Sequence, residues 1–194
     1  MPSRAVVGSL LVSALAIAGC DRQAAAPEQA NSAAPGRAAA PAAPAAPKGG
    51  TFDRSRKGEP APAVAFTGPK GEPVRFADFR GKPLLVNLWA TWCAPCVAEM
   101  PTLDAAAGML GDRVRVIAVS QDLDGRAKVD PFFASRGFKH LQPYTDPRIE
   151  LSTAYQANLP VTILYDADGR EVWRRAGAFE WDSAEAIAAV SEAS

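Results

Sequence analysis

Two cysteines separated by two residues are the side chains in this sequence best suited to covalent chemistry. Cys93 and Cys96 stand in the run Trp92-Cys93-Ala94-Pro95-Cys96. The apolar segment 84–89 precedes this run and a helix-forming segment follows it, so Cys93 is expected at the N-terminus of a helix. Unpaired backbone N–H groups at such an end stabilise a thiolate and lower the thiol pKa from about 8.5 to between about 3.5 and 7.5.

The spacing predicts different roles for the two thiols. Cys93, at the helix start and nearer solvent, is expected to be the nucleophile, and Cys96, one turn later, to close an internal disulfide with it. Pro95 fits the first helical turn, because the amide hydrogen that it lacks would have no partner there. Zinc binding is the alternative, but the sequence has one histidine, His140, and no second cysteine pair. We therefore predict a redox-active Cys93–Cys96 disulfide with no metal and no other cofactor.

The residues around the cysteines extend this pattern. Together they read Trp92-Cys93-x-Pro95-Cys96-x-x-Glu99-x-Pro101. The motif resembles the active site of the thioredoxin superfamily, and more narrowly that of TlpA-like and ResA-like membrane-tethered thiol–disulfide oxidoreductases. The resemblance extends from Gly58 to Trp181. It implies an extracytoplasmic enzyme, a protein-disulfide reductase that works through a mixed-disulfide intermediate.

The same resemblance implies roles for residues outside the dithiol. Pro160 matches a proline that forms a cis peptide bond and faces the two cysteines in this fold, and Leu159 before it would pair its backbone with a client strand. Glu99 matches a glutamate that lies near the cysteines and tunes their protonation, the alternative being an exposed glutamate. Pro160 and Glu99 are thus predicted catalytic residues. Trp92, Pro95 and Leu159 are predicted to bind the client.

Asn87 marks a departure from the cytosolic thioredoxins, which resemble one another in a buried aspartate at this place. Asparagine here is similar to the ResA-like branch, and proton handling would then rest on Glu99, water or the partner protein. Trp173 and Trp181 are interpreted as packing residues without a role at the site.

The order of the elements predicts an α/β class. Two short segments, 63–66 and 73–76, flank a turn and indicate an N-terminal hairpin. Further strands are predicted at 84–89, 114–120, 142–145, 158–165 and 170–175, and helices at 95–110, 148–156 and 182–190. Another helix, capped by residues 122–125, is predicted to reach residue 137. The order βαβ and then ββα favours an α/β sandwich with a mixed central sheet flanked by helices. The resemblance to TlpA-like proteins implies a thioredoxin-like fold, in which the N-terminal β-hairpin precedes the core and residues 142–156 form a central insertion.

The first residues of the chain are typical of an export signal. An apolar run from Ala5 to Ala18 is shorter than the about 20 residues that a membrane-spanning helix needs. It ends in Ile17-Ala18-Gly19-Cys20, which resembles a bacterial lipobox. Residues 1–19 are therefore predicted to be a lipoprotein signal peptide and Cys20 the lipidated residue. The alternative is an ordinary cleavage site with a stray cysteine.

Alanine and proline dominate the segment that follows. Residues 20–57 are predicted to be the lipidated cysteine and a disordered linker, because few branched or aromatic side chains are present to form a core. Residues 58–194 are predicted to be the thioredoxin-like domain. The expected location is the periplasmic side of a bacterial membrane. Asp21 resembles a signal for retention in the inner membrane.

The resemblance also implies partners. These are oxidised client proteins, such as apocytochrome c or proteins with copper-site thiols, and a membrane thiol-electron donor of the CcdA/DsbD type. No nucleic-acid partner is predicted, because 21 basic residues balance 21 acidic ones without a basic stripe.

Three alternatives to a reductase remain open. A disulfide oxidant or isomerase would use the same dithiol, because the C-x-x-C sequence does not fix the direction of electron flow. A thiol peroxidase would need threonine three residues before Cys93, where Ala90 stands, and a copper-delivery module would need one more residue between its cysteines.

Overall fold

The computed structural model describes residues 50–193. The predicted signal peptide, Cys20 and residues 21–49 of the predicted linker lie outside the described residues. The strands are β1 (Ala65–Thr67), β2 (Pro73–Arg75), β3 (Leu84–Trp89), β4 (Arg115–Ser120), β5 (Pro143–Thr145), β6 (Val161–Tyr165) and β7 (Glu171–Ala176). The helices are α1 (Ala94–Leu110), α2 (Arg126–Arg136), α3 (Glu150–Tyr155) and α4 (Ala184–Val190), with short 3-10 helices η1 (Phe76–Phe79), η2 (Gly111–Arg113) and η3 (Ser191–Ala193).

The strands form one mixed sheet in the order β2-β1-β5-β4-β3-β6-β7. β3 is an interior strand of the sheet: it pairs in parallel with β4 and antiparallel with β6. All six residues of β3 are buried, as expected of a strand with a partner on each edge and helices or loops on each face. The carboxyl end of β3 leads directly into the segment that carries Cys93.

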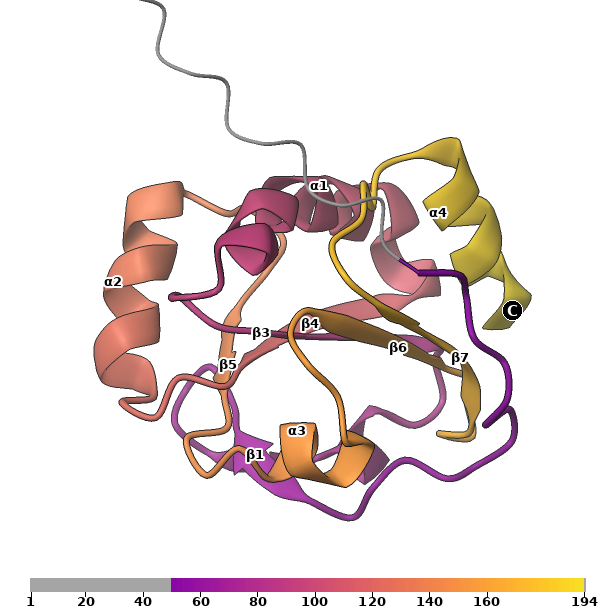
Figure 1. Ribbon diagram of the computed structural model, residues 1–194, viewed down its shortest axis with the longest axis horizontal. Coiled ribbons are helices and arrows are strands. Elements are labelled where there is room, and N and C mark those ends of the chain that lie inside the picture. Colours follow the sequence, from indigo (N-terminus) through magenta and orange to yellow (C-terminus); the bar gives the residue numbers. More distant parts are fainter. Residues whose placement is uncertain (1–49, 194) are drawn as a thin grey trace, which may run out of the picture. The chain divides into compact units, whose positions relative to one another are not determined.

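Two hydrophobic clusters cover the two faces of the sheet. One contains the apolar side of α1 with residues of α2, β7 and α4, and the other contains residues of the hairpin, η1 and α3. Figure 1 shows α1 and α4 on one side of the sheet and α3 on the other. Within β3, Leu85 and Trp89 face the first cluster and Val86 and Leu88 the second. This alternation decides which side chains of β3 meet α1.

The predicted fold class is confirmed, with shifts at the ends of elements. β1 and β2 form the predicted antiparallel hairpin. The predicted insertion supplies β5 and α3, and β5 joins the sheet by pairing in parallel with β4. The second predicted helix begins at Arg126, and its N-cap, Gly125, is the last residue of the predicted capping segment. None of the described helices is both long and apolar enough to cross a membrane.

The last part of the predicted linker, residues 50–57, is ordered, and this corrects the predicted domain boundary. Residues 50–57 are described, and Phe52 packs edge-on against Trp173 with 4.7 Å between ring centroids. Asp53 exchanges two backbone hydrogen bonds with Arg174, of 2.8 and 2.9 Å. The segment contains an aromatic and several charged residues in place of the alanines and prolines before it, so it has side chains that bind to the domain. The ordered domain therefore begins before the predicted residue 58.

Candidate active site

Cys93 and Cys96 are joined in a disulfide, with 5.2 Å between their Cα atoms. Cys93 is the N-cap residue of α1, and its sulfur accepts a 3.3 Å hydrogen bond from the backbone N–H of Cys96. Cys93 is 6% exposed and Cys96 is fully buried. Cys93 is therefore the cysteine that a reacting partner can approach more readily. This supports the predicted roles of nucleophile and resolving thiol.

The turn between β3 and α1 follows from the local sequence. β3 ends at Trp89, and the N–H of Cys93 donates to the carbonyl of Ala90 over 3.1 Å. Pro95 is the second residue of α1, where its missing N–H costs no intrahelical bond. The thiol at the helix start thus faces unpaired N–H groups, which favour its ionised form.

Pro160 and Leu159 lie at the same end of the sheet as the dithiol. Leu88 pairs with Val161, and this antiparallel register puts Pro160 across from Trp89, at the end of β3 that leads to Cys93. The Leu159–Pro160 peptide bond is cis, as predicted. The backbone of Leu159 makes no backbone hydrogen bond to another described residue, while the carbonyl of Pro160 accepts one from Gly177 over 2.9 Å. The polar backbone groups of Leu159 are therefore available to a further strand.

Glu99 is buried, so the alternative of an exposed glutamate is wrong. Its carboxylate accepts hydrogen bonds from Asn87 Nδ2 (2.8 Å), the N–H of Phe179 (2.9 Å) and Trp181 Nε1 (3.0 Å). Burial raises the pKa of the Glu99 carboxyl from 4.5 to about 7, and these three donors together with Arg175 oppose the rise. Glu99 lies one helical turn after Cys96. A carboxyl group that changes charge near neutral pH is thus built in close to the dithiol.

The sequence does not predict that Trp181 and Asn87 bind the carboxylate of Glu99. Trp181 was interpreted as a packing residue, yet its ring nitrogen binds a carboxyl 82 residues away in the chain, and no local pattern indicates such a pair. Asn87 had a usable signal. It alternates with Leu85 and Trp89 along β3 and therefore faces α1, where Glu99 lies.

His140 is not part of this site. Its ring lies against Gly108, near the opposite end of α1 from Cys93, about 22 Å away along the helix axis. It borders an open depression that also includes Lys82 and Arg115. Among residues 50–193, no group of three or more histidine, cysteine, aspartate or glutamate side chains is arranged to hold a metal ion.

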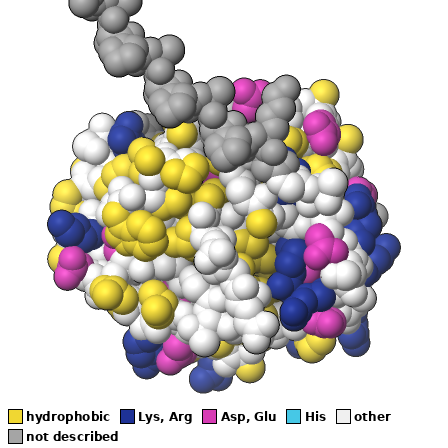
Figure 2. All heavy atoms as spheres, viewed as in Figure 1, with side chains coloured by type: hydrophobic (Ala, Val, Ile, Leu, Met, Phe, Trp, Pro, Cys, Tyr) yellow, Lys and Arg dark blue, Asp and Glu magenta, His cyan; other side chains and the backbone are white. Residues whose placement is uncertain are grey.

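The surface around the dithiol is apolar. Trp92 is 71% exposed, and Leu159 and Pro95 are half-buried. This exposure leaves the ring of Trp92 free to contact another protein. Figure 2 shows hydrophobic side chains gathered on the upper left of the face viewed, between the positions of α1 and α2 in Figure 1.

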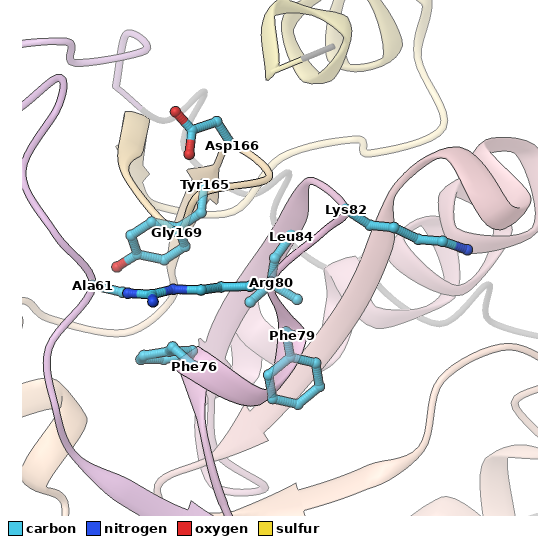
Figure 3. Close-up of a pocket in the computed structure, with 9 residues that line it drawn as sticks. All are labelled: Ala61, Phe76, Phe79, Arg80, Lys82, Leu84, Tyr165, Asp166 and Gly169. Carbon is cyan, nitrogen blue, oxygen red and sulfur yellow. The ribbon is translucent and has the colours of Figure 1, made fainter.

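A small pocket lies on the face of the sheet that is covered by the hairpin and η1 (Figure 3). Phe76, Phe79, Arg80 and Tyr165 are among the residues around it, and its volume is about 10 Å³. A space of that size holds about one water molecule at most. This pocket is therefore no substrate site, and the dithiol surface is the candidate active site.

Comparison with known proteins agrees with this geometry. A model of the Redoxin family matches residues 56–190. The chain belongs to the Redoxin family. Its Cys93–Cys96 pair is the redox-active disulfide of a thiol–disulfide oxidoreductase site of that family, as the sequence predicts.

Several curated relatives have names that describe thiol–disulfide exchange or likeness to thioredoxin. The chain is 36% identical over 124 residues to the thiol:disulfide interchange protein HelX of Rhodobacter capsulatus, covering 62% of this chain and 68% of HelX. It is 32% identical over 114 residues to the thiol-disulfide oxidoreductase ResA of Geobacillus kaustophilus, covering 58% of this chain and 64% of that ResA. It spans 38% of the thioredoxin-like protein YneN of Bacillus subtilis, at 37% identity over 65 residues.

Solved structures of other proteins share the fold. A DsbE-type thiol:disulfide interchange protein of Chlorobium tepidum superposes with a TM-score of 0.63 at 23% identity, covering 74% of this chain and 99% of that one. The exposed lipoprotein thioredoxin Etrx1 of Streptococcus pneumoniae gives a TM-score of 0.58 at 25% identity, covering 66% of this chain and 98% of that one. These structures support the thioredoxin-like architecture of the domain.

Proposed function

We propose that this redoxin reduces disulfides in client proteins outside the cytoplasm. The thiolate of Cys93 attacks one sulfur of a client disulfide, forms a mixed disulfide and releases the other client sulfur as a thiolate, which takes up a proton. The thiolate of Cys96 then attacks the Cys93 sulfur, closes the Cys93–Cys96 disulfide and releases the second client thiol. Two electrons pass from the dithiol to the client.

The difference in exposure between the two cysteines carries this proposal. Cys93 is at the surface end of α1 and Cys96 is fully buried behind it. The reaction therefore has a fixed order. The client disulfide reacts with Cys93 first, and the resulting mixed disulfide is then attacked by Cys96 from inside the protein. Glu99 supports the same chemistry, because a carboxyl with a pKa of about 7 can exchange a proton near the dithiol at neutral pH.

Client binding is assigned to the surface formed by Trp92, Pro95 and Leu159. Trp92 offers a large exposed apolar ring, and Leu159 offers backbone groups that no described strand uses. An extended client segment with its cystine above Cys93 would pair with the backbone of Leu159 and pack on Trp92. Apocytochrome c and copper-site proteins are the client classes that the resemblance to TlpA-like and ResA-like enzymes favours.

The direction of electron flow is tested in the native host. Cells are quenched with acid, free thiols are alkylated, and the ratio of reduced to oxidised full-length protein is measured by mass spectrometry. We expect most of the protein to be reduced, and to become oxidised when the membrane thiol-electron donor of the CcdA/DsbD type is removed. A protein that is fully oxidised in cells containing that donor would instead be an oxidant.

Cys20 is proposed to carry the lipid anchor, with residues 1–19 removed as a signal peptide and the linker leading to the domain. The lipobox-like run before Cys20 supports this proposal. We expect Cys20→Ser to move the protein from the membrane fraction to the soluble fraction, and the mass of the wild-type N-terminal peptide to include lipid. An unmodified Cys20 in membrane-bound protein contradicts the proposal.

A further inference from the structure

A buried carboxylate links the loop that ends at Cys93 to the neighbouring strand. The sequence predicts that residues 122–125 cap α2, but Gly125 is the N-cap of that helix and the carboxylate of Asp122 bonds elsewhere. Its Oδ1 accepts a 2.6 Å hydrogen bond from the hydroxyl of Thr91, and its Oδ2 accepts bonds from the Thr91 N–H (2.9 Å) and the Ser120 hydroxyl (2.7 Å). Asp122 is 3% exposed.

We propose that Asp122 is a positioning residue for thiol–disulfide exchange, which holds Cys93 in its reactive place by binding both the backbone and the side chain of Thr91. This inference rests on the dithiol site and not on the proposed direction of electron flow. It assigns a role in the reaction to two residues, Asp122 and Thr91, that do not touch the reacting sulfurs.

The loop has few other fixed points. Three residues separate the end of β3 from Cys93, and Thr91 is the middle one. On one side of it the N–H of Gln121 donates to the carbonyl of Trp89 over 2.8 Å, and on the other the N–H of Cys93 donates to Ala90 over 3.1 Å. The two bonds from Thr91 to Asp122 therefore join the middle of the loop to the end of β4.

The link matters most after reduction. In the disulfide form, a covalent bond also holds Cys93 to Cys96. When the disulfide opens, that restraint is lost, and the sulfur of Cys93 must stay near the N–H of Cys96, 3.3 Å away, for its thiolate to be stabilised. We therefore expect loss of the link to weaken thiolate formation at Cys93 in the reduced protein.

The link also fixes two surface residues. Trp92 follows Thr91, Leu123 follows Asp122, and both large apolar side chains are 71% exposed. A carboxylate suits this place because it accepts all three hydrogen bonds, and bonds to a charged acceptor are about twice as strong as neutral ones. Burying the carboxylate is unfavourable unless its oxygens accept hydrogen bonds, and Thr91 and Ser120 donate these bonds.

The test uses matched threonine substitutions in the full-length, reduced protein. The rate at which iodoacetamide alkylates Cys93 is measured against pH, with peptide mapping to separate Cys93 from Cys96. Loss of a hydrogen bond to a charged group leads us to expect that Thr91→Val lowers the rate at neutral pH by about fivefold and moves the pH profile to higher pH. Thr91→Ser, which keeps the hydroxyl, is expected to stay within about twofold of wild type.

Thr153→Val is the matched control, because Thr153 is exposed on α3 and its hydroxyl bonds only to the carbonyl of Ile149, among the described residues, over 2.8 Å. It should leave the alkylation rate unchanged. Asp122→Asn is expected to slow alkylation as well, and adding it to Thr91→Val should cost less than the sum of the two single effects, because both remove the same link.

A purely structural role gives a different result. If Thr91→Val and Asp122→Asn lower the melting temperature but leave the rate and pH profile of Cys93 alkylation as in wild type, the proposal is overturned. It is also overturned if Thr91→Ser is as slow as Thr91→Val. Should Asp122→Asn fail to fold, the three threonine variants still decide the question. A wrong direction of electron flow would leave these alkylation results unaffected.

Discussion

Cys96→Ser is expected to stop turnover while leaving one covalent step intact. Cys93 can still attack a client disulfide, but no thiol stands behind it to resolve the mixed disulfide, so the adduct accumulates. Turnover should fall by on the order of 10³ or more, as for removal of other catalytic nucleophiles. The adduct is detected by non-reducing electrophoresis and mass spectrometry, and a reductant should release the client from it.

Cys93→Ser is the paired variant for this experiment. It should lose turnover to the same extent but form no adduct, because the remaining thiol of Cys96 is fully buried. Finding the reverse, with adducts in Cys93→Ser and none in Cys96→Ser, would exchange the roles of the two cysteines.

Glu99 is expected to make the stability of the oxidised protein fall as the pH rises from 4.5 to 7. The pKa of this carboxyl is 4.5 in its ordinary state and about 7 in the folded protein, so between these values the folded state binds more protons than the unfolded state. Stability from this group is therefore full below pH 4.5, is lost progressively up to about pH 7, and stays lost above it. The shift corresponds to roughly 3 kcal/mol of unfolding free energy.

The measurement is urea unfolding of the disulfide form at several pH values between 4 and 8.5. Between pH 4 and 8.5 the unfolding free energy of wild type should fall by roughly 3 kcal/mol more than that of Glu99→Gln, because the amide does not titrate. A constant offset between the two curves does not affect this difference. Glu185→Gln, at an exposed position on α4, is the control and should follow the wild-type curve. Parallel curves for wild type and Glu99→Gln would show that Glu99 does not titrate in this window.

Features with a local signal in the sequence were predictable. β3 is found at the predicted residues 84–89, because an unbroken apolar run has few alternatives to a strand buried on both faces. α1 begins one residue before its predicted start, because the C-x-x-C run and Pro95 both indicate a helix N-terminus. The predicted hairpin depends in the same way on a turn whose glycines and prolines are adjacent in the chain.

Features that depend on contacts between residues far apart in the chain were not predictable from the sequence. The role of Trp181 depends on a segment between β7 and α4 folding back over Glu99, and no pattern near residue 181 indicates this. Asp122 looks like a helix cap in the sequence, since aspartate before a helix is a common capping residue, but the loop turns its carboxylate toward Thr91. Composition predicts a domain boundary at residue 58, because the amino-acid content of a segment does not show that Phe52 packs against an aromatic residue of β7.

The midpoint potential of the Cys93–Cys96 pair tests the proposed reductase most directly. The full-length protein is equilibrated with dithiothreitol or glutathione buffers, and the fraction of disulfide is measured after acid quenching and alkylation. We expect a midpoint at or below about −250 mV, in the range of thioredoxin, at which the dithiol can reduce client disulfides. A midpoint above about −180 mV would place the pair among disulfide oxidants and isomerases and would contradict the reductase.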